Sequence, residues 1–291
     1  MDSLAHLLSR FAEFARLREL AHSTWRAAVF LLLVFLVIYL IEGRSGADQS
    51  RYRSKNFRND VLYGLFYQGG AYQMFIGAAI ANMLGPRLDV FKIGVLAALP
   101  LPAMAVTYWL TTDFLQYWVH RMQHRIPFLW AFHSVHHANE RLSFISTYRI
   151  HPLDSVLGTT IMFVPLRIIG APTSTWMPLF VVQYGLEMLQ HAELDWSFGR
   201  AYRWIVSPRF HRLHHSAEHV HHDRNFSKVL SMWDFLFGTA VAPGTRADRF
   251  GVDGMLIGET IGAQLAAPFH TLHGQLVGRR PVPLARDEHR A

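Results

Sequence analysis

The sequence contains no cysteine and few charged residues. Because cysteine is absent from all 291 positions, the chain cannot form a disulfide, a thiolate-bound zinc site, an iron–sulfur cluster or a thiolate-ligated haem. Charged residues make up only 17% of the chain and apolar residues 51%, whereas about a quarter of the residues in a soluble domain are charged. This deficit favours a membrane protein over a soluble one.

The sequence contains several long segments without charged residues. An apolar run at 27–41 follows a segment, 1–26, whose leucines and phenylalanines recur at helical spacing. This pattern predicts an amphipathic helix on the membrane surface followed by a membrane span.

Two pairs of apolar segments follow, and each pair predicts a helical hairpin in the membrane. The pairs are 61–84 with 93–112 and 155–166 with 168–186, linked by predicted turns at 85–89 and 170–172. No alternating strand pattern is long enough to matter.

The fold class that follows is an all-α integral membrane protein with four to five transmembrane helices, namely two hairpins plus an N-terminal span. We divide the chain into an amphipathic segment at 1–26, a membrane-embedded domain at 27–240 and a polar C-terminal extension at 241–291.

The two hairpins predict the topology of this multi-pass protein. Each hairpin leaves and returns on one side, so the histidine-rich segments between and after the hairpins emerge on a single face of the bilayer. The loop 42–60 carries five Arg and Lys residues and shares that face. Because cytoplasmic loops carry the excess of basic residues, we expect a histidine-rich helical cap on the cytoplasmic face.

Histidine is concentrated in the middle of the chain, where 13 of the 18 histidines lie between positions 120 and 222. His120 and His124 are four residues apart, and HxxHH occurs twice, at 133–137 and 211–215. In a helix these spacings place the rings of each motif on one face, and two adjacent rings can address two neighbouring metals. His191 follows Glu187 by one turn.

These motifs predict a metal centre with nine imidazole ligands. The nine residues are His120, His124, His133, His136, His137, His191, His211, His214 and His215. Nine ligands exceed the needs of one ion and suit two metals with open positions, but imidazole binds iron, copper, zinc and nickel alike. Asp113 lies on the same helical face as His120, and we expect its carboxylate to orient that ring.

The other histidines are weaker candidates. We expect His219, His221 and His222 to lie in a mobile loop and not to bind metal. His6, His22, His270, His273 and His289 are interpreted as surface residues. His151, which precedes Pro152, is either a ligand or a helix-start residue.

The ordered motifs from about 112 to 240 resemble those of the fatty acid hydroxylase/sterol desaturase superfamily. The motifs are HRMQH at 120–124, HSVHH at 133–137, HP at 151–152, QHAEL at 190–194, HRLHHS at 211–216 and WDFLFGT at 233–239. The resemblance implies membrane helices capped by a cytoplasmic di-iron site, with O2 as co-substrate, external electrons and a lipid substrate that is hydroxylated or desaturated. It also implies that the nine histidines bind two iron ions, for which zinc can substitute.

The resemblance extends to residues that support or complete the ligand set. Asn225 with Phe226 resembles the Asn–aromatic pair of the superfamily, so we expect Asn225 to support the ligands. Related acyl hydroxylases carry a further histidine at the position of Glu187. Glu187 and His151 are therefore the two candidates for a tenth ligand.

The partners expected are a membrane lipid, of sterol or fatty acyl type, and a separate electron-transfer protein, because no nucleotide-binding motif or fused haem domain is evident. No nucleic-acid partner is expected. We expect the lipid to enter laterally between the hairpins, past Gly158 and along a tunnel lined by Tyr108, Trp109, Phe114, Tyr117 and Trp118; helix packing is the alternative role for these residues.

Two other functions remain open at this point. One is a divalent-metal transporter or metal-binding membrane protein, although the histidines lie outside the apolar runs in which transporters place their ligands. The other is a zinc-dependent membrane hydrolase with Glu187 or Glu193 as its water-activating carboxylate.

Overall fold

The computed structural model describes residues 2–93, 99–170, 177–241, 244, 246–252, 255 and 257–277. Within these ranges the chain is helical and forms no β-strand; an isolated bridge pairs Ser216 with Phe250. The side chains of 2–15, on which the predicted amphipathic face depends, lie outside the described set, as do most of the predicted turn at 170–172 and the surface residue His289.

The α-helices are α1 (Asp2–Arg44), α2 (Lys55–Gln68), α3 (Ala78–Leu88), α4 (Leu101–Arg125), α5 (Pro127–His137), α6 (Pro152–Ile168), α7 (Met177–His191), α8 (Pro208–His214), α9 (Met232–Leu236) and α10 (Ile261–Leu276). Short turns of other helix types are η1 (Gln49–Arg53), η2 (Gln73–Gly77), η3 (Asp89–Phe91), η5 (Phe144–Tyr148), η7 (Gly199–Arg203) and η8 (His219–His221).

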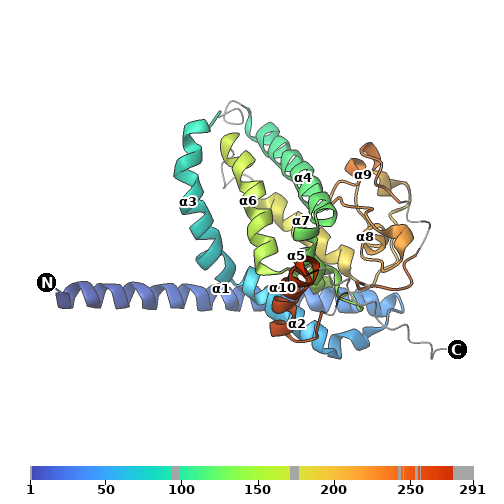
Figure 1. Cartoon of the computed structure of the whole chain (residues 1–291), viewed down its shortest axis with the longest axis horizontal. Helices are drawn as coiled ribbons and strands as arrows, with labels where there is room; N and C mark the ends of the chain where they lie inside the picture. Colours follow the sequence, from blue (N-terminus) through green and yellow to red (C-terminus); the bar gives the residue numbers. More distant parts are fainter. Residues whose placement is uncertain are drawn as a thin grey trace.

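Figure 1 shows α1 running along the base of the molecule, with α3, α6 and α4 rising from it. α5 and α10 lie below the lower ends of α4 and α7, and the short helices α8 and α9 lie to their right. Among the described residues, two helical segments are long and apolar enough to cross a membrane, Arg16–Arg44 and Gln73–Phe91. These segments are consistent with a membrane protein, while the larger number of spans stays a prediction.

The apolar run 61–84 does not form the single helix that its composition predicts. α2 ends at Gln68, and Gly70 adopts a φ of 91°, a conformation that favours glycine. The chain then continues through the π-helical turn η2 into α3. The predicted turn at 85–89 is also wrong, because α3 remains helical through Pro86 to Leu88.

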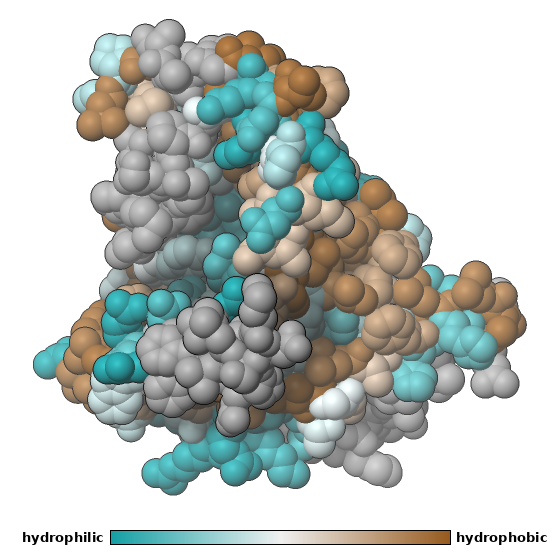
Figure 2. Space-filling model, turned by 90° about the vertical axis from the view of Figure 1, so that its left-hand side faces the viewer, coloured by the Kyte–Doolittle hydropathy of each residue, from teal (hydrophilic) through white to brown (hydrophobic). Residues whose placement is uncertain are grey.

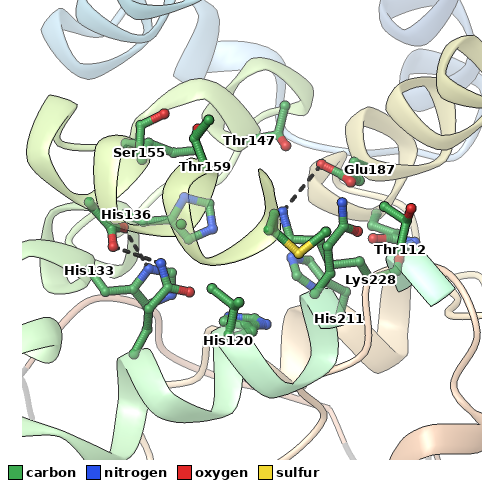
Figure 3. Close-up of a pocket in the computed structure, with 18 of the residues that line it drawn as sticks. Thr112, His120, His133, His136, Thr147, Ser155, Thr159, Glu187, His211 and Lys228 are labelled. Atoms are coloured by element: carbon green, nitrogen blue, oxygen red, sulfur yellow. Dashed lines mark hydrogen bonds and ion pairs between the residues drawn. The ribbon is translucent and has the colours of Figure 1, made fainter. Parts of the chain in front are cut away.

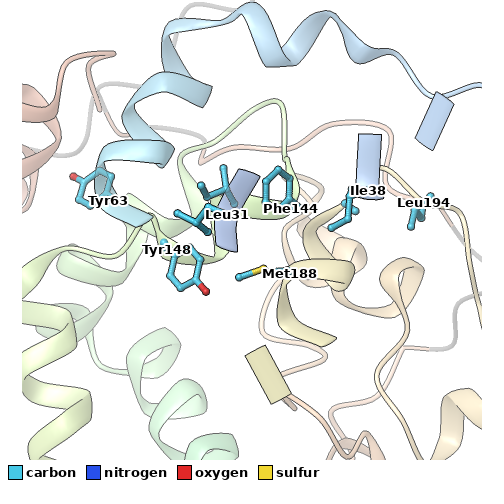
Figure 4. Close-up of a cluster of buried hydrophobic side chains, with 9 residues drawn as sticks. Leu31, Ile38, Tyr63, Phe144, Tyr148, Met188 and Leu194 are labelled. Atoms are coloured by element: carbon cyan, nitrogen blue, oxygen red, sulfur yellow. The ribbon is translucent and has the colours of Figure 1, made fainter. Parts of the chain in front are cut away.

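A buried apolar cluster joins α1 to η5 and α7 (Figure 4). Leu31 and Ile38 of α1 pack with Phe144 and Tyr148 of η5 and with Met188 near the end of α7. Because this packing removes apolar surface from water, it fixes the end of α7, which carries His191.

The opposite side of α1 remains uncovered. Leu32, Leu33, Val37 and Leu40 are each more than half exposed, as is Phe75 of η2. On the face seen in Figure 2, brown apolar side chains are exposed over much of the surface and are interrupted by hydrophilic ones. Large exposed apolar areas of this kind mark surfaces that contact a membrane or a partner.

Candidate metal centre

The structure brings all nine predicted histidines together in two groups. His120, His124, His133, His137 and His214 form the five-histidine group, and His136, His191, His211 and His215 form the four-histidine group. Within each group the candidate ligand atoms lie within 4.8 Å of one another. The adjacent pairs His136–His137 and His214–His215 divide between the groups, so each HxxHH motif contributes to both.

Proline helps to start both helices that carry HxxHH. Pro127 opens α5 and Pro208 opens α8, where the fixed φ of proline suits the first helical turn. At α8 the Ser207 hydroxyl also accepts a hydrogen bond from the backbone N–H of Phe210, which caps the helix. These starts determine which way the three rings of each motif face.

The nitrogen spacing of the four-histidine group fits one shared ion. The Nε2 atoms of His211 and His191 are 3.2 Å apart, those of His215 and His211 3.1 Å, and those of His191 and His136 3.5 Å. Two imidazole nitrogens that each lie about 2.1 Å from one metal would be roughly 3.0–3.4 Å apart. The spacings of 3.1 and 3.2 Å fall in that range, and the His191–His136 spacing of 3.5 Å is slightly longer.

The five-histidine group offers buried nitrogens without a hydrogen-bond partner. The Nε2 atoms of His124, His133, His137 and His214 are all in this state. Buried polar atoms are rarely left unpaired, because each costs about 1–3 kcal/mol. A bound metal would give these nitrogens a partner, so the residues present fit a metal site.

Burial favours the neutral form of eight of the imidazoles, and a metal ligand must be neutral. It lowers the pKa of His191 to about 4 and that of His214 to about 3. Burial, followed by repulsion from neighbouring rings, lowers the pKa well below its ordinary value in His120, His124, His136, His137, His211 and His215.

Hydrogen bonds from Nδ1 orient four of the rings and leave Nε2 for a metal. Nδ1 donates from His120 to the Phe226 carbonyl (2.7 Å), from His214 to the Arg224 carbonyl (2.8 Å), from His191 to the Glu187 carbonyl (2.8 Å) and from His133 to the Asp154 carboxylate (2.9 Å). Such bonds select the tautomer and direction of a metal-binding ring.

Asp154 was not predicted from the sequence. Its buried carboxylate accepts hydrogen bonds from His133 Nδ1 and from the Gln123 amide at 2.6 Å. The available signal was an acidic residue in the first turn of a helix that begins with the His-Pro motif, but the position of His133 across from that turn is a tertiary feature.

The prediction that the Asp113 carboxylate orients the His120 ring is wrong. The Asp113 carboxylate instead accepts hydrogen bonds from the backbone N–H groups of Val229 and Leu230, both at 3.1 Å, and from the Trp233 indole at 2.8 Å. A helical wheel gives the face on which a side chain lies, but not the neighbouring segment that meets it. Asp113 therefore acts on the loop that follows Phe226.

Asn225 also acts on this loop and contacts the histidines only through it. Its amide donates to the Phe210 carbonyl at 2.9 Å, and its side-chain oxygen accepts from the Val241 N–H at 2.7 Å. The φ of Asn225 is 55°, a region that asparagine tolerates better than most residues. Asp234 of the WDFLFGT motif accepts from the N–H groups of Phe226 and Ser227. The loop thus presents the Phe226 and Arg224 carbonyls to His120 and His214.

Neither contender for a tenth ligand joins a histidine group. The Glu187 carboxylate accepts from Gln183 at 2.9 Å and faces Lys228 at 3.8 Å. His151 caps α6, since its Nδ1 accepts from the Leu153 N–H and its Nε2 donates to the Leu265 carbonyl. Both His151 nitrogens are therefore used, which supports the helix-start role.

A cavity of about 370 Å³ adjoins the histidines (Figure 3). Five ligand candidates reach its wall, namely His120, His133, His136, His191 and His211. α6 contributes the apolar Met162, Phe163 and Leu166 together with Gly158 and the polar Asp154, Ser155 and Thr159. Glu187 and Lys228 also line the cavity.

The predicted aromatic lining of this cavity is wrong. Phe114, Tyr117 and Trp118 pack against Phe237, with ring centroids 5.0–6.2 Å away. None of the five predicted aromatic residues is among the described residues that line the cavity. The side chains between Thr112 and His120 that line the cavity are Gln116 and Val119.

A family model described as fatty acid hydroxylase matches residues 105–239, the segment that contains all nine histidines. The chain is 28% identical to ornithine lipid hydroxylase OlsE of Rhizobium tropici over 278 residues, which cover 93% of this chain and 83% of that protein.

Other relatives match over shorter segments. Human alkylglycerol monooxygenase is 30% identical over 135 residues, which cover 45% of this chain and 29% of that protein. Methylsterol monooxygenase 1-3 of Arabidopsis thaliana is 25% identical over 159 residues, 52% of this chain and 54% of that protein. No solved structure matches the chain.

Proposed function

Because the matches to this chain fit the fatty acid hydroxylase/sterol desaturase superfamily, we propose that the protein is an O2-dependent lipid hydroxylase with a di-iron centre. Its named relatives are lipid hydroxylases and monooxygenases, which supports an oxidoreductase. The observation that carries the proposal is the pair of buried histidine groups beside a cavity lined by both apolar and polar side chains.

We assign one iron to each histidine group. The donor set consists of neutral imidazoles, which suit iron but also zinc and copper, so the choice of iron rests on the superfamily. When bound, an iron pair would activate O2, the oxidant, for attack on an unactivated C–H bond, which no side-chain acid or base can do. The chain itself orients the rings, through the loop 224–230 and through Asp154.

The cavity supports a polar lipid as substrate. The α6 residues Met162, Phe163 and Leu166 offer apolar surface for a hydrocarbon chain, next to the polar Ser155 and Thr159. Glu187 and Lys228 add one carboxylate and one ammonium group to the lining. This pair complements a head group that carries both charges, as an ornithine head group does. We therefore propose that the reacting carbon lies at or near the head group of the lipid, with the remaining hydrocarbon directed along α6.

We further propose a multi-pass membrane placement with the metal centre on the cytoplasmic side. Support comes from the two candidate spans and from the basic loop 42–60. The domain boundaries at 27–240 and 241–291 stay predictions. α10, which lies beyond position 240, contacts α5 directly, so we include it in the cap.

Lipid mass spectrometry after expression in a host that makes ornithine lipids tests the proposal. A gain of one oxygen atom on an identified lipid is expected, whereas a loss of two hydrogen atoms would indicate desaturation. Metal analysis of the purified protein should find two iron ions per chain. One zinc ion per chain would favour the hydrolase, and variable loading would favour a metal-binding protein.

Gly158 allows a matched test of the cavity. A Cβ atom added at Gly158 would meet only Val119 Cγ1 at 3.9 Å, so Gly158→Ala fits and gains about 1 kcal/mol of helix propensity. Gly158→Phe would instead extend into the cavity. We expect the alanine variant to retain lipid turnover, and the phenylalanine variant to lose at least tenfold while it keeps its metal. Equal turnover in both variants would place the substrate elsewhere.

A further inference from the structure

A second cavity reaches the five-histidine group from another direction. It has a volume of about 420 Å³, and His124, His137 and His214 line it together with Trp130 and Asp223. None of the described residues that line it also lines the first cavity. The five-histidine group therefore separates the two cavities, with His120 and His133 facing the proposed lipid site. We call the second cavity the Trp130 cleft.

Trp130 connects this cleft to the candidate ligands. Its ring centroid lies 5.0 Å from that of His124 and 5.4 Å from that of His137, so the indole packs against both rings. Trp130 is half-buried and contributes to the wall of the cleft. Trp130 therefore places, in the wall of the cleft and beside the exposed ligand rings, an aromatic ring that contacts two of the candidate ligands.

Lipid hydroxylation requires such a partner. The balanced reaction is RH + O2 + 2 e⁻ + 2 H⁺ → ROH + H2O, so two electrons and two protons must arrive for each oxygen atom inserted. The chain carries no redox cofactor motif of its own, and the lipid occupies the first cavity during the reaction. Because electron transfer slows steeply with distance, the carrier must approach the ligands from another side.

We propose that the Trp130 cleft is the docking site of a small acidic one-electron carrier protein, which reduces the metal centre past Trp130. This inference rests on the proposed function. The occupant is argued from charge, since three arginines lie on the segments beside the cleft.

Arg125 follows His124 and forms an ion pair with Asp223 at 3.5 Å. Arg224 is exposed and donates to the Gly238 carbonyl, and Arg121 donates to the Tyr117 hydroxyl. Among the described residues, neither Arg121 nor Arg224 forms an ion pair with a carboxylate. At the rim beside Asp223 the three arginines outnumber that carboxylate, while Glu140 lies beside Gly251 on another part of the wall. The whole chain has a net charge of +7. A basic patch of this kind speeds encounter with an acidic protein.

The test uses the iron-loaded protein and a reduced, acidic plant-type [2Fe–2S] ferredoxin as the probe. Reduction of the metal centre is followed by stopped-flow absorbance without lipid, over a series of ferredoxin concentrations and ionic strengths. For Arg125→Glu and Arg224→Glu we expect at least tenfold weaker apparent affinity for ferredoxin and a flatter salt dependence. For Trp130→Leu we expect unchanged affinity but at least tenfold slower reduction at saturating ferredoxin, with partial recovery in Trp130→Phe.

Arg203→Glu provides the matched control, because Arg203 is exposed on η7 and the variant makes the same charge change away from the cleft. Reduction by the uncharged reductant duroquinol, together with metal content, shows whether each variant retains an intact centre. Equal effects of Arg203→Glu and Arg125→Glu, or fast reduction of a metal-loaded Trp130→Leu variant, would overturn the inference. Because the assay omits lipid, failure to hydroxylate any lipid would refute the proposed function and leave these rates interpretable.

Discussion

Replacement of Asp154 by alanine tests whether a carboxylate outside the ligand set controls metal affinity. The Asp154 side chain is 1% exposed and accepts two hydrogen bonds, from His133 Nδ1 at 2.9 Å and from the Gln123 amide at 2.6 Å. A hydrogen bond to a charged group contributes about 1.5–3 kcal/mol. At about 1.4 kcal/mol per factor of ten, loss of the bond to His133 corresponds to roughly 10- to 150-fold in metal affinity.

This range agrees with the roughly 10- to 100-fold losses that follow removal of residues supporting metal ligands. Metal affinity is best measured by titration of the apo-protein with Co²⁺ in the presence of a competing chelator, with the cobalt absorption bands as the signal. We expect the five-histidine group to lose affinity and the four-histidine group to keep it, since His133 belongs to the first. Asp154→Asn should lose less, because its amide oxygen can still accept from His133.

Asp89→Asn serves as the control, because Asp89 is nearly half exposed and pairs with Arg167 away from the histidines. It should bind cobalt like the wild type. The reasoning about Asp154 is refuted if Asp154→Ala binds both metals with wild-type affinity, or if Asp154→Ala and Asp89→Asn weaken binding equally.

The remaining predictions concern the two histidine groups and the loop that supports them. His214→Ala and His136→Ala each remove a ligand from a different group, so each should abolish lipid turnover and lower metal content by about half, with the protein still in the membrane fraction; full metal content in both would contradict the ligand assignment. Asp113→Ala leaves three donors without their acceptor and should destabilise the protein by about 3 kcal/mol or more, measured as a lower thermal unfolding midpoint. Asp113→Asn keeps an acceptor and should lie between the alanine variant and the wild type; equal midpoints for all three proteins would show that the loop does not depend on Asp113.

The sequence alone was sufficient to identify the histidines of the candidate metal centre and the superfamily that the chain resembles. HxxxH and HxxHH are local patterns, and the 3.6-residue period of a helix places their rings on one face wherever that helix packs. The low charge content predicted a membrane protein, because composition can be read from the sequence without knowledge of tertiary contacts.

Only the tertiary structure decided what surrounds those rings. The carbonyl of Phe226 that holds His120 lies 106 residues away in sequence, and the carboxylate that holds His133 belongs to Asp154 rather than to Asp113. The sequence also did not predict the break between α2 and η2 at Gly69–Gly70. Nor did it predict that Phe114, Tyr117 and Trp118 lie outside the cavity lining. Periodicity states which residues share a face, but the neighbour that each face meets depends on packing between distant segments. The division of nine ligands into groups of five and four is therefore a property of the fold.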